Sequence, residues 1–325
     1  MKKDEIPPDI SVVVPVYNEQ DNIGLFLKRT VPVLEKIGTY EIIFCLDPST
    51  DRTEEVILQA AEKNPRVRYI LFSRRIGQPS AVLGGILNCQ GDSCVPIDVD
   101  LQDPPELIAD LYAEYSKGND VVLAQRRIRE GETLVKKFVS YLGYKVINVI
   151  AEVEIPRNTG DFRIMSRRVV EELRRLSESH GFLRGLIALV GFKQGIVKYN
   201  RDARAFGEGN YNRYFGSLKI GFNGLIGFSS SLLSLTLLAG VLIAGVSMLA
   251  AIGIIISKLF FDKGYPMGAP TIIILILFMG GVQLISIGVL GEYIGRIYDE
   301  VKKRPRFVID RASEALKIRD YGNRN

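Results

Sequence analysis

Two long segments without charge, both near the C-terminus, constrain the fold of this chain more than any other feature. The segments 220–257 and 264–291 contain no Asp, Glu, Lys or Arg. Each is longer than the roughly 20 residues that an α-helix needs to cross the hydrocarbon core of a bilayer. The sequence therefore predicts two transmembrane helices, at 226–257 and 270–295.

Positive charge on both sides of this helix pair predicts its orientation. The connecting loop carries only Lys258, Asp262 and Lys263, whereas Lys and Arg are frequent before the first helix and after the second. Because cytoplasmic flanks are the ones rich in Lys and Arg, we expect an integral protein of the plasma (inner) membrane with both termini in the cytoplasm. The first residues contain no apolar h-region, so we expect no cleavable signal peptide.

These segments predict four parts of the chain. Aromatic and apolar residues at helical spacing, with basic residues among them, precede the first helix and indicate a segment lying in the membrane interface. The basic residues after the second helix indicate contact with anionic lipid. The predicted parts are a cytosolic domain (1–205), an interfacial amphipathic segment (206–224), a two-helix transmembrane domain (225–297) and a cytosolic basic tail (298–325).

Composition excludes several other classes. Hydrophobic residues make up 47% of the chain and charged residues 24%, which rules out a disordered or fibrous protein. The single histidine, His180, excludes a multi-histidine metal site within one chain, and three cysteines are too few for a disulfide framework. The net charge of +5 is modest, and the basic residues cluster at the membrane edge, so we expect no nucleic-acid partner.

Before the membrane segments, short β-branched runs alternate with segments of helical spacing. This alternation predicts an α/β domain with a mostly parallel sheet. In such sheets ligands bind beyond the carboxyl ends of the strands. The predicted strands are 10–16, 41–47, 67–72, 93–98 and 120–125, and the predicted helices are 20–37, 53–63, 79–88 and 104–117.

Polar residues follow three of these strands, at 17–19, 47–51 and 98–103. Asp98 and Asp100 are two residues apart, so in an extended segment their side chains point to the same side. A divalent cation relieves the repulsion between two carboxylates, and oxygen ligands suit Mg²⁺ or Mn²⁺, which often bind substrate phosphates as well. The pattern indicates a metal-bridged nucleotide diphosphate. Asp103 has an alternative interpretation, as the cap of a helix that begins at Pro104.

Three motifs carry a resemblance to a known family: VVVPVYNE (12–19), the acidic strand end at 47–51 and DVDLQDPPE (98–106). Together they resemble family-two inverting glycosyltransferases of GT-A fold, in particular dolichyl-phosphate mannose synthase and its bacterial relatives. The two C-terminal spans are similar to those of the bactoprenol (undecaprenyl-phosphate) glucosyltransferases. The resemblance implies transfer of a sugar from a nucleotide donor to a polyprenyl phosphate, with Mg²⁺ or Mn²⁺.

The resemblance also implies roles for residues at the strand ends. Asp47 would lie at the uracil or ribose, Asp98 would contact the nucleotide, and Asp100 would hold the metal with the diphosphate. Asp98 is the second predicted metal ligand, and Arg75, after the third strand, is a candidate contact for a donor phosphate. The predicted donor-binding residues are Pro15, Tyr17, Glu19, Asp47, Arg75, Asp98 and Gln102.

On the acceptor side, the segment 158–163 (NTGDFR) matches the motif that this family carries before a helix. Asp161 would lie beside the sugar and Arg163 would contact a phosphate, so the predicted catalytic residues are Asp161, Asp100 and Arg163. Two structural alternatives stay open. Asp161 could cap the helix that runs through Arg175. Arg163 could form an ion pair with Asp161.

The sequence departs from the family at two places. The usual Asp-Asp-Gly-Ser reads Leu46-Asp47-Pro48-Ser49, so only one carboxylate remains there. Downstream, the usual Arg-x-x-Gly-x-Ser-Lys reads Arg204-Ala-Phe-Gly-Glu-Gly-Asn, without the Lys. The acceptor phosphate is then expected to rely on other cations, with Arg201, Arg204, Arg213 and Lys219 as candidates.

The resemblance to the subgroup favours glucose from UDP-glucose as the transferred sugar. Mannose, galactose, N-acetylglucosamine and a formylated aminoarabinose are alternatives. A processive or protein-directed enzyme would usually carry a Gln-x-x-Arg-Trp motif, and this chain has no Trp. A non-enzymatic scaffold is disfavoured by the intact Asp98, Asp100 and Asp161. Two helices are few to enclose a lipid site, so we expect a homo-oligomer.

Overall fold

The computed structural model describes residues 7–127, 159–176, 183–201, 269–302, 304–316 and 318, with scattered positions between 233 and 260. Three of the predicted acceptor-phosphate residues, Arg204, Arg213 and Lys219, lie outside the described residues. The predicted interfacial segment lies outside them as well.

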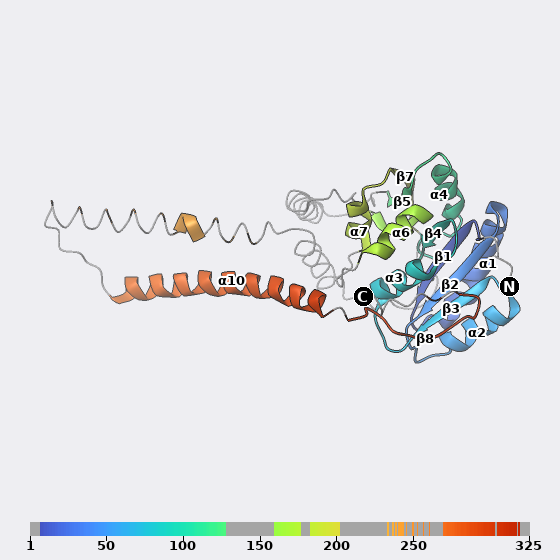
Figure 1. The fold of residues 1–325 in the computed structure, drawn as a ribbon, viewed down its shortest axis with the longest axis horizontal. Helices are drawn as coiled ribbons and strands as arrows, with labels where there is room; N and C mark the ends of the chain where they lie inside the picture. The colour runs from blue at the N-terminus through green and yellow to red at the C-terminus, as the bar shows by residue number, and fades with distance from the viewer. Residues whose placement is uncertain are drawn as a thin grey trace.

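An eight-stranded mixed sheet forms the framework of the N-terminal domain, in the order β7-β5-β6-β4-β1-β2-β3-β8 (Figure 1). Four neighbouring strands are parallel: β4 (Ser93–Pro96), β1 (Ile10–Val16), β2 (Tyr40–Leu46) and β3 (Val67–Phe72). Beside them, β6 (Thr159–Ser166) runs antiparallel to both β4 and β5 (Val121–Arg126), and β7 (Gln194–Tyr199) is parallel to β5. The predicted α/β domain with a mostly parallel sheet is confirmed.

Helices cover both faces of this sheet. One apolar core lies against α1 (Gln20–Ile37), α2 (Thr53–Lys63) and α4 (Leu107–Tyr115), and a second lies against α3 (Gln78–Asn88), α6 (Arg167–Arg175) and α7 (Leu183–Val190). All seven residues of β1 and of β2 are buried, which explains why both strands are mostly apolar. The four predicted helices are present, although α4 begins three residues later than the sequence suggested.

A strand from the C-terminal region completes the sheet. β8 (Ile309–Ala312) pairs antiparallel with β3, and the Ser73 amide donates to the Val308 carbonyl at 3.0 Å. Phe307 packs edge-on against Phe72, and Leu316 is buried in the second core. The sequence analysis assigned these residues to a basic tail and missed this strand, because its pairing depends on a partner more than 230 residues away.

Between the domain and β8 runs the long helix α10 (Ala269–Val301), which extends away from the sheet (Figure 1). Among the described residues, one stretch is long and apolar enough to cross a membrane, Phe278–Val301, with a mean hydropathy of 1.3 and none of it buried. α10 contains the second predicted span. The first span lies largely outside the described residues, so the pair of transmembrane helices stays a prediction.

Docking of the C-terminal segment predicts a measurable contribution to stability. Leu316 is 5% exposed and Ile318 is 40% exposed. Leu316→Ala removes core contacts and should lower the free energy of unfolding by about 2–5 kcal/mol, which lowers the midpoint of thermal unfolding by at least about 4 °C. Ile318→Ala is the matched control and should leave the midpoint unchanged. Circular dichroism of the full chain in detergent measures both, and equal midpoints for the two variants would contradict the docking.

Candidate functional site

The carboxyl ends of the parallel strands define one edge of the sheet, here called the carboxyl edge. Because β6 runs antiparallel to β4 and β5, its first residues lie at this same edge, with Thr159 opposite Gln125. The structure therefore brings Asp161 to the edge that also carries the residues following β1, β2 and β4. The sequence analysis expected Asp161 just before a helix. Asp161 lies in β6 instead, and the antiparallel pairing of β6 brings it to the predicted site.

Asp47, at the end of β2, holds the loop that follows β3. Its carboxylate accepts hydrogen bonds from the backbone amides of Ile76 (3.1 Å) and Gly77 (2.8 Å), and the residue is buried. We call residues 73–77 the donor loop. Asp47 thus holds this loop, and its contact with uracil or ribose stays a prediction, because a carboxylate oxygen that accepts one amide can accept a second hydrogen bond.

The donor loop places Arg75 on Tyr17. The Arg75 guanidinium lies 3.9 Å from the centre of the Tyr17 ring, a cation–π contact that joins the ends of β1 and β3. Two predicted donor-binding residues are thus in contact. Pro15, by contrast, is buried within β1 beside Cys45, and Glu19 accepts a hydrogen bond from Asn22 (2.6 Å) at the start of α1.

Asp98 and Asp100 follow β4 and are both partly exposed. The Gln78 amide donates to Asp98 at 2.6 Å, and the Gln102 backbone amide donates to Asp100 at 3.1 Å. Leu101, which lies between Asp100 and Gln102, has a φ of +59°. This left-handed conformation is strained for a non-glycine residue and is kept only where the surroundings enforce it. The loop is therefore fixed in a shape that presents two carboxylates.

The pKa of Asp98 is raised to about 7, first by burial and then by the charges of Asp100, Asp103 and Asp161. Asp98 therefore lies close enough to the other three carboxylates to be repelled by each of them. Such repulsion is what a bound cation relieves.

Asp103 is neutralised by the protein itself. It is buried and forms ion pairs with Arg126 (3.3 Å) and Arg201 (3.2 Å), and it accepts a hydrogen bond from the Tyr199 hydroxyl. Burial, followed by Asp103, raises the pKa of Tyr199 to about 12, so the hydroxyl stays protonated. The interpretation of Asp103 as a helix cap is wrong: α4 begins at Leu107, and Asp103 bonds to arginines instead.

Asp161 is the second carboxylate with arginine partners. Arg184, at the start of α7, donates its Nε to the Asp161 carboxylate at 2.9 Å, and the Arg163 guanidinium lies 3.9 Å from the same oxygen. Burial raises the pKa of Asp161, but Arg184, Arg163 and Arg126 outweigh it and hold that pKa below its usual value. Asp161 does not cap a helix, because Ser166 caps α6.

Arg163 is enclosed behind Asp161. It is 2% exposed and donates to the backbone carbonyls of Gly160 (2.6 Å) and Asp161 (3.3 Å). Burial lowers its pKa to about 10, so it stays charged at neutral pH. The alternative role of Arg163, an ion pair with Asp161, is present in the structure, with a long distance of 3.9 Å between the guanidinium nitrogen and the carboxylate oxygen. Arg163 thus lies behind Asp161, and its contact with a phosphate stays a prediction.

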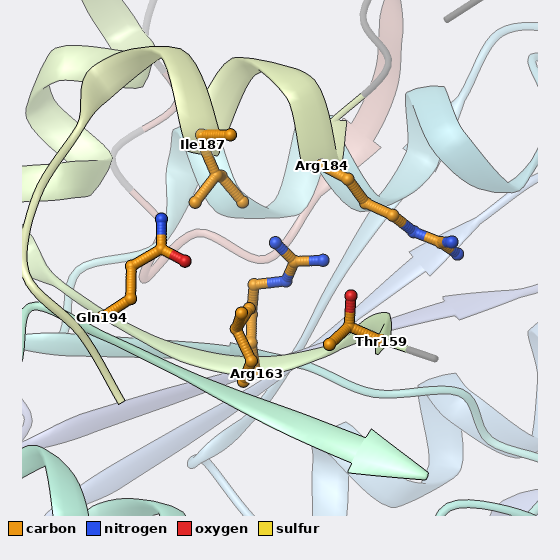
Figure 2. Close-up of a pocket in the computed structure, with 7 residues that line it drawn as sticks. Thr159, Arg163, Arg184, Ile187 and Gln194 are labelled. Atoms are coloured by element: carbon orange, nitrogen blue, oxygen red, sulfur yellow. The ribbon is translucent and has the colours of Figure 1, made fainter. Parts of the chain in front are cut away.

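A small cavity separates Arg163 from α7. Its volume is about 10 Å³, the lower limit of the space that one water needs. Figure 2 shows Arg163 rising from β6 toward α7, with Arg184 and Thr159 on one side and Gln194 on the other. The cavity is too small for a sugar or a phosphate.

The ion pairs divide the four carboxylates into two kinds. Asp103 and Asp161 have arginine partners, whereas within the described part of the chain no cation pairs with Asp98 or Asp100. Among the described residues, no three Asp, Glu, Cys or His side chains form a metal cluster. Mg²⁺ is commonly held by one or two carboxylates together with substrate phosphates. The Asp98–Asp100 pair fits a metal that arrives with a diphosphate.

Arg126, Tyr199 and Arg184 are site residues that the sequence analysis missed. Each lies at a strand end or helix start, but no motif or spacing sets it apart from other basic or aromatic residues. Their partners are identified only by the strand order β7-β5-β6, which places them beside Asp103 and Asp161.

Comparisons with known proteins identify the family of this chain. The family model of glycosyl transferase family 2 matches residues 11–174. The prophage bactoprenol glucosyl transferase homolog of Escherichia coli (strain K12) is 39% identical over 94% of this chain and 99% of its own length. The bactoprenol glucosyl transferase of Shigella phage SfX is 41% identical over 92% of this chain and 98% of its own length. An uncharacterized glycosyltransferase of Bacillus subtilis (strain 168), YkcC, is 41% identical over 93% of this chain and 93% of its own length.

Solved structures are more distant. Glucosyl-3-phosphoglycerate synthase from Mycobacterium tuberculosis, in complex with Mn²⁺, UDP-glucose and phosphoglyceric acid, is 18% identical and covers 67% of this chain and 78% of its own, with a TM-score of 0.44. The mannosyltransferase PcManGT from Pyrobaculum calidifontis is 16% identical and covers 89% of this chain and 88% of its own, with a TM-score of 0.41. The family match and the curated relatives together show that this chain belongs to glycosyl transferase family 2 and is a glycosyltransferase.

Proposed function

We propose that this chain transfers a hexose from a nucleotide sugar to a polyprenyl phosphate at the cytoplasmic face of the membrane. UDP-glucose is the proposed donor and undecaprenyl phosphate the proposed acceptor. The observation that carries the proposal is the pair Asp98 and Asp100, whose carboxylates lack a described cationic partner beside the arginine-bound Asp161. The acceptor and the sugar are suggested by relatives named bactoprenol glucosyl transferases, which match over more than nine tenths of the chain.

The donor would bind along the carboxyl edge. Tyr17 and Arg75 supply an aromatic ring and a cation at the end of β1, and Asp98 and Asp100 would hold Mg²⁺ or Mn²⁺ at the diphosphate. When bound, the metal would neutralise the leaving diphosphate. Arg201, which already pairs with Asp103, is a candidate for the acceptor phosphate together with the undescribed Arg204, Arg213 and Lys219.

The reaction needs no strong base. A phosphate monoester has a second pKa near 6, so the acceptor is largely a dianion at pH 7 and is already a nucleophile. One of its oxygens attacks the anomeric carbon in line, the bond to the diphosphate breaks, and the configuration inverts. Asp161, whose pKa is held low by arginine, is suited to orienting the sugar as a carboxylate and is a poor proton acceptor.

The acceptor's lipid tail stays in the bilayer, so the site must face the membrane surface. The apolar side chains of α10 are widely exposed in the single chain, Leu284 and Ile285 among them, and need an apolar environment. We propose that α10 spans the membrane with the predicted helix 226–257, that both termini are cytoplasmic, and that copies of the chain associate there.

A direct assay tests this proposal. Purified full-length protein in detergent receives undecaprenyl phosphate, Mg²⁺ or Mn²⁺, and one radiolabelled nucleotide sugar at a time. We expect solvent-extractable label from UDP-glucose, abolished by EDTA and reduced at least about 100-fold by Asp100→Ala. Label from a different sugar would correct the donor, and no label from any donor would contradict the proposed acceptor.

Arg75 offers a test of the donor site with a matched control beside it. Arg75→Ala removes the cation that is predicted to meet a donor phosphate and should raise the Kd for UDP about 3- to 30-fold, or about 0.7–2 kcal/mol, as expected for one charge-assisted contact. Arg74→Ala removes the same charge from the neighbouring position and should change the Kd less than about twofold. Isothermal titration calorimetry measures both. Equal effects would indicate a general loss of positive charge.

The raised pKa of Asp98 predicts that metal affinity depends on pH. With a pKa of about 7, protons compete with the metal below pH 7, so Mn²⁺ affinity without nucleotide should rise about tenfold from pH 6 to pH 8. Electron paramagnetic resonance of free Mn²⁺ measures this. Asp98→Asn should weaken binding and flatten its pH dependence, whereas a flat profile in the unmodified protein would contradict competition between a proton and the metal at Asp98.

A further inference from the structure

Asp161 needs a fixed orientation if its carboxylate is to orient the transferred sugar. It lies near the start of β6 and is partly exposed, so strand pairing alone does not fix its side chain. Two guanidinium groups approach the same carboxylate oxygen, Arg184 at 2.9 Å and Arg163 at 3.9 Å. Only the Arg184 contact is within hydrogen-bonding distance.

Arg184 is itself held in place by its helix. Leu183, Leu186 and Ile187 of α7 are buried in the second core together with residues of α6. Arg184 follows Leu183 directly, so its Cα cannot shift without moving a packed helix. Its side chain is 29% exposed, so it reaches from the anchored helix to the carboxylate at the edge of the site.

We propose that Arg184 is a positioning residue that holds the Asp161 carboxylate for the transfer step. This inference rests on the proposed function, in which Asp161 orients the sugar. The lowered pKa of Asp161 agrees with it, since the Arg184 charge is the largest influence that opposes burial. Arg163 has a different relation to Asp161. Arg163 is enclosed, and it donates its hydrogen bonds to the backbone carbonyls of Gly160 and Asp161.

A double-mutant cycle tests whether Arg184 acts through Asp161. Arg184→Met should lower kcat about 10- to 100-fold in the unmodified protein, the loss expected when a reacting group is misplaced by about 1 Å, with the KM for the donor changed less than about threefold. In the Asp161→Asn background, Arg184→Met should lower kcat less than about twofold. Equal losses in both backgrounds would overturn the proposal, because a merely structural role would not depend on Asp161.

Two further variants control for charge and folding. Arg175→Met removes the same charge from the neighbouring helix α6, where Arg175 pairs with Glu172 at its surface, and should leave kcat within about twofold. Arg184→Lys keeps the charge and should recover part of the lost kcat. If Arg184→Met does not fold, Arg184→Lys in the two Asp161 backgrounds decides the question by the same criterion.

A binding measurement separates this inference from the proposed acceptor. If the unmodified protein transfers nothing to undecaprenyl phosphate, the proposed function fails, and the same cycle is run on the Kd values for UDP-glucose and UDP. Arg184→Met should then weaken UDP-glucose at least about threefold and UDP less than about 1.5-fold, and only when Asp161 is present. Equal weakening of both ligands, or no weakening, would overturn the role of Arg184.

Discussion

At the carboxyl edge, Asp98 is repelled by the charges of Asp100, Asp103 and Asp161, and arginines neutralise only part of this group. Arginines pair with Asp103 from β5 and from the segment after β7, and with Asp161 from α7 and from β6 itself. Asp98 keeps a pKa of about 7, and no described cation pairs with it or with Asp100. The negative charge that remains is therefore confined to one pair of carboxylates. A cation carried by a diphosphate is what that pair is suited to receive.

The same edge is connected mechanically to the apolar helix. α10 ends at Val301, and the chain then returns to the domain as β8. Val308, the residue before β8, accepts a hydrogen bond from the Ser73 amide through its backbone carbonyl. Ser73 begins the donor loop that places Arg75 on Tyr17. The segment that leaves the proposed membrane helix thus borders the proposed donor site within a few residues. In the proposed arrangement, this continuity would tie the glycosyltransferase domain to the membrane surface.

Local patterns were sufficient to predict some features and insufficient for others. The strands from β1 to β5 are rich in apolar residues, and the helices between them have regular spacing, so both were predicted from the sequence. Asp98, Asp100, Tyr17 and Arg75 followed from strand ends and motifs. The pairing of β8 with β3, the enclosure of Arg163 and the arginine partners of Asp103 and Asp161 depend on antiparallel strands that meet only in the folded chain. No local spacing encodes such contacts.

Mn²⁺ stoichiometry in the presence of UDP tests the division of the carboxylates most directly. Electron paramagnetic resonance on the full-length protein should detect one bound ion per chain, lost in Asp100→Asn and retained in Asp161→Asn. Loss of the ion in Asp161→Asn, or retention in Asp100→Asn, would contradict the assignment of Asp98 and Asp100 as the metal pair.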